Sequence, residues 1–457
     1  MVALPEAFLE QMRREIGADE AAALAVALDG AAPVSVRLNP AKTEGEPLFA
    51  TARAVPWSRY GRYLDRRPQF TLDAAFHAGA YYVQEAGSQF VDYLLRDEQL
   101  EGARILDMCA APGGKTTIYS TIAGRDGLVV ANEYVRNRAN ILADNVRKWG
   151  VGNVVVTNND TPTVAGFGGW FDVVAVDAPC SGEGMFRKDE GARNEWSAEG
   201  VRMCAARQIA ILRDAWQSLA AGGLLLYSTC TFNTTEDEGV LRAFADEAGD
   251  EITESAAVDV PSEWGIVCSK VGAFQTFRFM PHRTEAEGFF VAVARKAFDV
   301  SMRVTTPRAR KQILAEVPTA DRKELSRWVR EPEQMRFAVA GDTIYGYRRA
   351  RYDDVRTLAQ SLTVIYSGVA MGQIFKGNLK PDWALSQYID LQRDAVACAE
   401  VDEPTALDYL RKRDVRAEGF EQGLNLVEYG GRPLGFLKRI GARCNNLYPN
   451  SLRIMNM

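Results

Sequence analysis

The sequence lacks the features of a membrane protein, a secreted protein and a zinc-binding module. No apolar run approaches the roughly 18 residues that a membrane-spanning helix needs. The N-terminal stretch MVALPEAFLEQMRREIG carries acids and has no signal-type apolar region. The seven cysteines include no C-x-x-C pair, so no zinc ribbon and no other metal site is expected. We therefore expect a cytoplasmic protein whose cysteines are free thiols.

Two nucleotide-binding motifs are also missing. The chain has no G-x-G-x-x-G, which argues against a dinucleotide-dependent oxidoreductase. The stretch DMCAAPGGKTT (107–117) ends like a phosphate loop, but that motif requires glycine at position 109 and the chain has Cys109. A nucleoside triphosphate site is therefore not expected.

Length and charge limit the domain number and the kind of partner. A chain of 457 residues predicts two or three domains, and its net charge of -6 argues against a surface covered in non-specific nucleic-acid contacts. Two segments are nevertheless basic: 302–351 has twelve Lys/Arg against six Asp/Glu, and 411–457 has nine against four. They fit phosphate contact by dedicated surfaces, although solvated helix faces would explain 302–351 equally well.

Between about 103 and 297, short apolar runs alternate with amphipathic stretches. ARILDMCA, GLVVANE, NVVVTNND, FDVVAVDAP and GGLLLYSTC read as strands, and all but the third are followed by a stretch of helical length. Alternating strands and helices predict a parallel, doubly wound α/β sheet. FQTFRFMPH and GFFVAVARK then predict a closing antiparallel edge.

The remaining sequence predicts smaller units on both sides of this sheet. Residues 1–70, with an amphipathic helix and the strand PVSVRLNP, predict an accessory domain, and 298–360 predicts a basic, mostly helical linker domain. Residues 361–457 predict a β-rich module with strands in SLTVIYSGVAMGQIF, GLNLVEYGGRPLGFLKRI and SLRIM. The catalytic domain then spans 71–297, and no dimerisation signal is evident.

The chemistry is expected at the carboxyl ends of the strands, where doubly wound sheets bind ligands. The first strand leads into the turn at Gly113 and Gly114, and the next three end at Glu133, Asp160 and Asp177. Three acids suit a neutral adenosine joined to a cationic sulfonium, which favours S-adenosylmethionine over NAD. Singly, each acid is equally explained as a turn residue or helix cap.

Two cysteines also follow strand ends. If the fourth and fifth strands are neighbours, roughly 4.8 Å apart, Cys180 and Cys230 face one crevice beside the methyl donor. A thiolate that adds to carbon 6 of a cytosine makes carbon 5 nucleophilic enough to take a methyl group. Asp177, three residues before Cys180, is placed to assist at N3 of the base.

These residues carry a family resemblance. CAAPGGK (109–115), DAPCSGEG (177–184) and STCTFN (228–233), with YYVQEAGSQ and MPHRTEAEGFFVA around them, resemble the Nol/Nop/Sun-type RNA cytosine-C5 methyltransferases over about 71–297. MGQIFKGNLKPDWAL and GGRPLGFLKRIGARCNNLYPNSLRI resemble the PUA-like region of bacterial RsmF-type enzymes, which modify 16S ribosomal RNA. The fold implied is α/β: a Rossmann-like class I methyltransferase sheet with a small N-terminal accessory domain and a β-rich PUA-like C-terminal module.

The resemblance also implies roles for residues. Cys230 would be the nucleophile and Cys180 would assist release, the reverse of the order in DNA enzymes, while Lys115 and Asp177 would orient or activate the base. Arg138 matches a structural arginine of the family. The residues implied to bind S-adenosylmethionine are Cys109, Ala110, Ala111, Pro112, Gly113, Gly114, Lys115, Glu133, Asp160 and Asp177.

The implied function is methylation of carbon 5 of cytosine in 16S ribosomal RNA, either free or in the small ribosomal subunit, without membrane or metal. The same chemistry on transfer RNA and a non-catalytic RNA-binding assembly factor remain alternatives. The target base must leave its stack. Phe186, Tyr227 and Phe232 are candidates to stack on it or to line the pocket as core residues, and Arg187 and Lys188 are candidate phosphate contacts.

Overall fold

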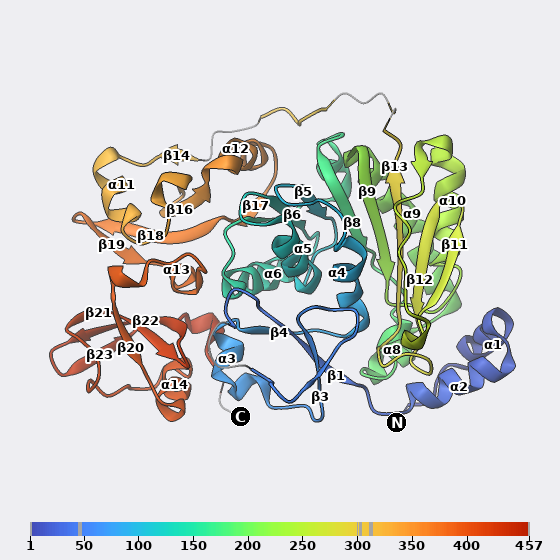
Figure 1. Cartoon of the computed structure of the whole chain (residues 1–457), viewed down its shortest axis with the longest axis horizontal. Coiled ribbons are helices and arrows are strands. Elements are labelled where there is room, and N and C mark those ends of the chain that lie inside the picture. The colour runs from blue at the N-terminus through green and yellow to red at the C-terminus, as the bar shows by residue number, and fades with distance from the viewer. Residues whose placement is uncertain (1, 44–47, 299, 301–303, 310–313, 456–457) are drawn as a thin grey trace.

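The computed structural model describes residues 2–43, 48–298, 300, 304–309 and 314–455 (Figure 1). Five apolar runs form parallel strands at the centre of a ten-stranded sheet, as predicted. The strand order reverses between β5 and β8, which is the switch point where ligands bind in such sheets. In spatial order the strands are β7 (Val154–Thr157), β6 (Leu128–Asn132), β5 (Arg104–Asp107), β8 (Phe171–Asp177) and β9 (Leu219–Thr229).

Antiparallel strands extend this sheet on both sides. The predicted closing pair is confirmed as β12 and β13, and the short β10 and β11 were not predicted. On the far side, β17 comes from the C-terminal part of the chain and pairs with β7, which ties that part to the catalytic sheet. These strands are β10 (Ile252–Thr253), β11 (Val267–Val271), β12 (Phe274–Phe279), β13 (Phe289–Lys296) and β17 (Val364–Ser367).

Helices cover both faces of the sheet and enclose two hydrophobic cores. The pattern is clear in α6, where Ala139, Leu142, Ala143 and Val146 recur at helical spacing and are buried. One face carries α4 (Phe90–Leu95), α5 (Gly114–Ala123) and α6 (Arg136–Trp149). The other carries α7 (Thr161–Ala165), α9 (Ala198–Ser218), α10 (Glu238–Ala248) and α12 (Tyr352–Ser361).

The N-terminal region is larger than predicted. Its antiparallel sheet takes in residues up to Val83, beyond the expected boundary at 70, because β4 pairs with β1. The two N-terminal helices pack near α8 (Glu190–Glu195), which follows the first cysteine loop (Figure 1). The elements are α1 (Glu6–Ile16), α2 (Ala18–Leu28), β1 (Val34–Leu38), β2 (Arg53–Ala54), β3 (Gly61–Leu64), α3 (Ala74–His77) and β4 (Tyr81–Val83).

The prediction that 298–360 is mostly helical is wrong. Its alternating segments MRFAVA and TIYGYR form strands that share a five-stranded sheet with residues beyond 360, so the expected boundary cuts a sheet. The sheet contains β14 (Ala315–Glu316), β15 (Met335–Ala340), β16 (Thr343–Arg348), β18 (Val369–Phe375) and β19 (Asn378–Pro381), with α11 (Thr319–Ser326) beside it.

The last region is a four-stranded sheet that packs against the N-terminal helix α3 at the opposite end of the molecule from α1 (Figure 1). The predicted strand SLRIM is wrong, because Asn450–Leu452 forms a 3-10 turn. The elements are α13 (Trp383–Gln387), β20 (Ala397–Glu400), α14 (Glu403–Leu410), β21 (Gly423–Tyr429), β22 (Arg432–Ile440) and β23 (Arg443–Asn446).

The basic segment 302–351 is paired with acids at four of its described residues, Arg322, Arg327, Arg348 and Arg351. Arg348 contacts Asp126 and Glu331, and Arg351 contacts Asp354. Arg303, Arg310 and Lys311 of this segment lie outside the described residues. No helix in the described part of the chain is long and apolar enough to cross a membrane.

Candidate active site

A tight turn joins β5 to α5 at the switch point. Gly113 has φ = 112°, and an added Cβ there would lie 2.9 Å from Leu142 Cδ1, so the turn requires glycine. Just before the turn, Asp107 accepts a hydrogen bond from Thr116 Oγ1 at 2.7 Å. Burial raises the pKa of Asp107 to about 7. Arg138 Nη2 donates to Ala111 O at 2.9 Å and holds the turn against α6.

The predicted cofactor acids Glu133 and Asp160 differ in their surroundings. The Glu133 carboxylate is buried; it accepts from the Val135 amide at 2.9 Å and lies 3.5 Å from Arg138 Nη1. Asp160 is exposed and accepts from the Thr163 amide at 3.1 Å, as the N-cap of α7. Glu133 is therefore tied to the glycine turn through Arg138, whereas the observed role of Asp160 is that of a helix cap.

A cavity of about 660 Å³ lies between the turn and the N-terminal sheet. Its size is within the range of small-molecule sites. The acids Glu85, Asp107 and Asp177 line it, so the site offers negative charge to a cation and acceptors to hydroxyls, as S-adenosylmethionine requires. Glu133 does not line the cavity but is joined through Arg138 to the lining residue Ala111. The predicted site residues among those that line it are Cys109, Ala110, Ala111, Pro112, Gly114, Lys115 and Asp177.

Lys115 and Asp177 form an ion pair at the wall of this cavity. Their Nζ and Oδ2 atoms lie 2.9 Å apart, and Ser228 Oγ donates to the other Asp177 oxygen at 2.7 Å. The Lys115 ammonium also lies 5.1 Å from the Phe289 ring centre. Burial alone would lower the pKa of Lys115, but Asp177 outweighs it and the net shift is upward. Lys115 is therefore a charged donor, and Asp177 is an acceptor on both oxygens.

The two strand-end cysteines meet, as predicted from the neighbouring strands β8 and β9. Their sulfur atoms are 3.1 Å apart, and the Cys230 amide donates to Cys180 Sγ at 3.4 Å. Both thiols are free and partly exposed. The hydrogen bond to Cys230, followed by burial, raises the pKa of Cys180 well above its ordinary value. Cys180 is therefore a neutral thiol at physiological pH.

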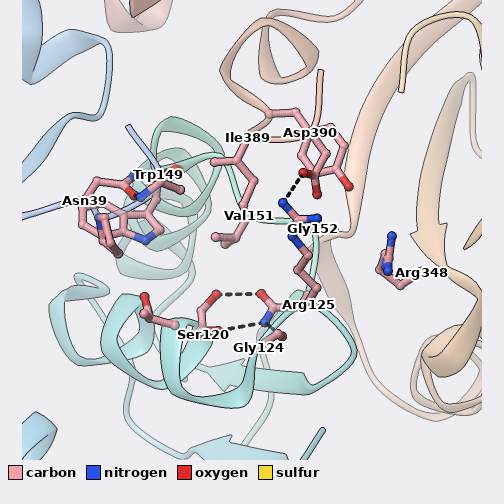
Figure 2. Close-up of a pocket in the computed structure, with 15 residues that line it drawn as sticks. Asn39, Ser120, Gly124, Arg125, Trp149, Val151, Gly152, Arg348, Ile389 and Asp390 are labelled. Atoms are coloured by element: carbon pink, nitrogen blue, oxygen red, sulfur yellow. Dashed lines mark hydrogen bonds and ion pairs between the residues drawn. The ribbon is translucent and has the colours of Figure 1, made fainter. Parts of the chain in front are cut away.

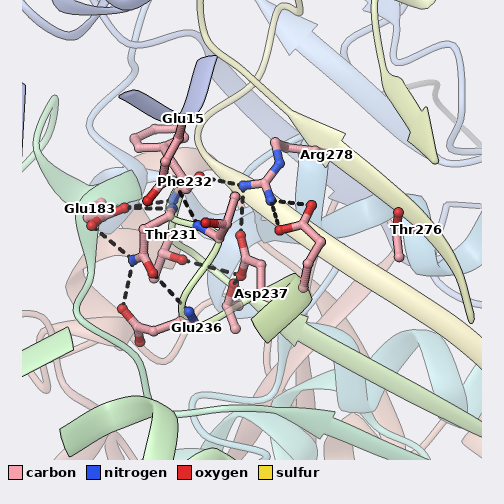
Figure 3. A network of polar contacts seen from close by, with 12 residues as sticks. Glu15, Glu183, Thr231, Phe232, Glu236, Asp237, Thr276 and Arg278 are labelled. Carbon is pink, nitrogen blue, oxygen red and sulfur yellow. Dashed lines mark hydrogen bonds and ion pairs between the residues drawn. The ribbon is translucent and has the colours of Figure 1, made fainter. Parts of the chain in front are cut away.

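Two buried carboxylates bond the cysteine loops to each other in both directions (Figure 3). Glu183, on the Cys180 loop, accepts from the Phe232 and Asn233 amides of the Cys230 loop at 2.8 and 3.1 Å. Glu236, on the Cys230 loop, accepts from the Ser181 amide of the Cys180 loop at 3.0 Å. The reciprocal bonds fix the relative position of the two sulfurs.

A second buried pair anchors the Cys230 loop to the sheet (Figure 3). Asp237 accepts from Thr229 Oγ1 at 2.6 Å and from Arg278 Nη1 of β12 at 2.7 Å. Arg278 also donates to Phe232 O at 2.5 Å. Thr229 directly precedes Cys230, so this pair restrains the backbone on one side of the thiol.

Glu183, Glu236 and Asp237 were missed by sequence reasoning as site residues. Glu183 lies three residues after Cys180, and the acids of TFNTTEDE follow Cys230 closely. That proximity was the available signal, although acids in such turns usually face solvent.

The structure corrects the expected substrate contacts. The candidate stacking residues Phe186, Tyr227 and Phe232 are at most 1% exposed, and Phe8 of α1 packs on Phe186 at 5.1 Å, so these rings are core residues. Arg187 is buried and its Nε lies 3.0 Å from Glu287, so it is not free to bind phosphate. Lys188 is partly exposed and lines the cavity.

The likeness to known proteins covers most of the chain. Residues 94–295 match the family model described as 16S rRNA methyltransferase RsmB/F, residues 4–86 match the N-terminal domain of 16S rRNA methyltransferase RsmF, and residues 397–454 match the methyltransferase RsmF PUA domain. The first model falls on the central sheet and both cysteine loops. The other two fall on the N-terminal region and the last sheet.

Relatives and solved structures agree with these matches. A structure named NSun6 from Pyrococcus horikoshii with SFG has a TM-score of 0.53 at 21% identity, covers 65% of this chain and 99% of its own, and shares the fold. The ribosomal RNA small subunit methyltransferase F of Aeromonas salmonicida is 32% identical over 92% of this chain and 90% of its own length. That of Erwinia tasmaniensis is 30% identical over 99% and 97%. With likeness at this level along its whole length, the chain belongs to the 16S rRNA methyltransferase RsmF family of S-adenosylmethionine-dependent enzymes.

Proposed function

We propose that this protein methylates carbon 5 of a cytosine in small-subunit ribosomal RNA, with Cys230 as the nucleophile and Cys180 as the group that assists release. The observation that carries the proposal is the pair of free thiols, 3.1 Å apart, at the ends of adjacent strands beside the Lys115–Asp177 pair. Two thiols in this position have no use in simple transfer to an oxygen or nitrogen atom. They suit a substrate carbon that must first be activated.

Different cofactor residues are proposed to contact different parts of S-adenosylmethionine. The turn from Cys109 to Gly114 offers close backbone contact, Glu133 accepts from ribose hydroxyls, and Asp107 and Asp177 face the positive end. Bound S-adenosylmethionine supplies an electrophilic methyl group. Asp160 is the weakest member of the predicted set, because it is exposed and already caps α7.

The base is proposed to be held by Lys115 and Asp177. Because Asp177 accepts on both oxygens, it suits the exocyclic amino group of cytosine, and Lys115 is the donor available to the ring acceptors. This arrangement changes the sequence-based hypothesis, in which Asp177 itself served N3. Hydrogen bonding from Lys115 withdraws electrons from the ring and favours attack at carbon 6.

The cysteines then act in order. The Cys230 thiolate forms a bond to carbon 6, and the electrons of the 5,6 double bond make carbon 5 nucleophilic. After carbon 5 has gained the methyl group, solvent water accepts the proton of carbon 5, and the electrons of that C–H bond restore the 5,6 double bond. The Cys230 sulfur then leaves carbon 6 as a thiolate, with the electrons of the broken bond. Cys180 is a neutral thiol whose sulfur lies 3.1 Å from that of Cys230, so it is placed to donate a hydrogen bond to the departing sulfur.

RNA as the substrate is supported by the match to an RsmF PUA domain at 397–454 and by the names of the relatives. Within RNA, the base must be unstacked to reach Cys230, which favours a loop or a locally opened helix. The described residues contain no cluster of His, Cys, Asp and Glu suited to a metal ion.

The test is methyl transfer by the purified protein to three substrates: a 16S rRNA transcript, small ribosomal subunits that lack the modification, and total transfer RNA. Labelled S-adenosylmethionine measures transfer, and base-resolution mapping locates the product. We expect 5-methylcytosine in the 16S rRNA or the subunit. Transfer to transfer RNA alone would contradict the proposed substrate, and no transfer to any of them would favour a non-catalytic assembly factor.

A further inference from the structure

A second cavity, of about 320 Å³, lies where three distant stretches of the chain meet. The contributing stretches are 41–42 after β1, 387–393 from the end of α13 onward, and 431–433 at the start of β22, with Arg330 at its wall. In Figure 1, α13 and β22 lie close together, beside the N-terminal region. The four basic residues Lys42, Arg330, Arg393 and Arg432 line this basic pocket, and none of the described residues that line it is an acid.

Two of the four cations form the floor of the basic pocket. Lys42 Nζ donates to the backbone oxygens of Ala78 and Lys148 at 2.9 and 2.8 Å and to Gln387 Oε1 at 3.2 Å, all neutral acceptors. Arg432 is buried, and its Nε donates to Lys42 O at 3.0 Å. Burial, followed by repulsion from Lys148 and Arg393, lowers the pKa of Lys42. The floor of the basic pocket is therefore held in place by these bonds, and the charge that faces a ligand comes from the other two residues.

The other two cations are exposed and available to a ligand. Arg393 is 44% exposed and has one acid partner, Glu428, at 3.0 Å. Arg330 is exposed, and among the described residues its guanidinium has no acceptor. An exposed guanidinium presents several N–H donors in a planar fork that matches two oxygens of a phosphate.

The adjoining cavity provides an internal comparison (Figure 2). It shares Tyr388 and Ile389 with the basic pocket, but its Arg125 is paired with the buried Asp390 at 2.8 Å. Its other arginine, Arg348, is paired with Asp126. An exposed guanidinium without an acceptor among the described residues, that of Arg330, is therefore found at the basic pocket and not in the adjoining cavity.

We propose that the basic pocket binds a backbone phosphate of the RNA substrate, with Arg330 and Arg393 as the direct contacts. The inference rests on the proposed function for the nature of the polyanion. It adds an anchoring point built jointly by the N-terminal region, the sheet that contains β16 and β18, and the last sheet. Such a point contacts the RNA backbone outside the catalytic cavity and makes no contact with the bases.

The test is the salt dependence of RNA binding by wild type, Arg330→Gln, Arg393→Gln and the double variant. Each phosphate contact that is lost reduces the slope of log Kd against log salt by roughly 0.7 to 0.9. We expect each single variant to lose about one such unit and the double variant about two, with affinity for a 16S rRNA transcript about tenfold weaker at low salt. At saturating RNA, kcat for methyl transfer should be unchanged while KM for RNA rises.

The matched control is Arg327→Gln, which removes the same charge from an exposed arginine three residues before Arg330 that does not line the basic pocket. Its slope should equal that of wild type. A merely structural effect in the other variants would weaken binding at every salt concentration without changing the slope, and thermal unfolding would reveal it.

Two outcomes would overturn the proposal. An unchanged slope and Kd in the double variant would exclude a phosphate contact here, while methyl transfer by wild type would show that the proposed function still stands. If inorganic phosphate at constant ionic strength stabilised wild type but not the double variant, and the RNA slope were unchanged, the basic pocket would be a small-anion site. Because binding is read without catalysis, loss of methyl transfer leaves the slope measurement valid.

Discussion

Charged side chains are buried and hydrogen-bonded at the catalytic edge of the sheet, whereas two of those at the basic pocket are exposed to solvent. At the catalytic edge, Glu183, Glu236 and Asp237 are completely buried and bonded to N–H or O–H donors. At the basic pocket, Arg330 and Arg393 are exposed, and Arg330 has no acceptor among the described residues. Bond formation between a sulfur and a ring carbon requires fixed atoms, because a displacement of about 1 Å can cost roughly 100-fold in rate. A phosphate contact requires mainly charge, which flexible side chains can supply.

The largest effect on methyl transfer is expected from removal of the proposed nucleophile. Cys230→Ala should lower methyl transfer to 16S rRNA by about three orders of magnitude or more, because the ring is no longer activated. The affinity for RNA should stay within about twofold of wild type. Labelled methyl transfer and filter binding measure the two effects. Cys204→Ala, which removes a thiol of α9, is the control and should keep nearly full activity.

The next largest effect should come from the bonds between the two loops. Glu183→Gln replaces one carboxylate oxygen with an NH₂ group. Either the two backbone amides at Oε2 or the Asn233 and Trp196 side chains at Oε1 then lose their acceptor. We expect roughly 1–3 kcal/mol of lost stability and about 100-fold slower transfer. Thermal unfolding and single-turnover kinetics measure these. Glu195→Gln, an exposed acid on α8, should change neither. Equal activity of Glu183→Gln and wild type would show that the loops hold themselves in place.

The same carboxylate predicts a pH dependence. Burial raises the pKa of Glu183 to about 7. Since this folded-state pKa lies above the ordinary value, the stabilising contribution of the protonated acid is fully present below about pH 4.5 and is lost as pH rises to 7. Activity should change in the opposite direction, because only the carboxylate accepts all its donors. We expect the rate of methyl transfer to fall up to about tenfold from pH 7 to 6 in wild type. The pH profile of Glu183→Gln should lack this decrease. If the variant showed the same decrease in rate, the titrating group would be a residue other than Glu183.

The smallest effects should separate a buried acid from an exposed one. Glu133→Gln should raise KM for S-adenosylmethionine about tenfold, because its buried carboxylate lies beside the glycine turn. Asp160→Asn should leave KM within about twofold and stability unchanged, because asparagine caps helices as well as aspartate does. Initial-rate kinetics with varied cofactor measure both. A tenfold effect of Asp160→Asn would restore it to the cofactor site.

The sequence predicted the catalytic edge better than the rest of the molecule for physical reasons. Apolar runs that end in an acid or a cysteine indicate buried parallel strands. The doubly wound pattern then predicts that β8 and β9 are neighbours. The burial of Phe186 and Phe232 could not be predicted, because it depends on α1, which lies more than 170 residues away in sequence.

The C-terminal half shows both kinds of failure. In 335–348 the alternation of a strand was present, but the high charge of the surrounding segment favoured a helical interpretation. The basic pocket has no local signal at all, since Lys42, Arg330, Arg393 and Arg432 come from distant parts of the chain. The edge strand β17 was predicted as a strand, but its partner β7, some 200 residues earlier, was not.

The most direct test of the central claim is the search for a covalent RNA adduct in Cys180→Ala and Cys230→Ala after expression in cells. Denaturing electrophoresis with and without nuclease reveals the adduct. The proposed roles predict a nuclease-sensitive, slower-migrating species in Cys180→Ala alone, because attack by Cys230 is intact and release is impaired. An adduct in Cys230→Ala would reverse the two roles, and the absence of any adduct in both variants would contradict covalent catalysis by this pair.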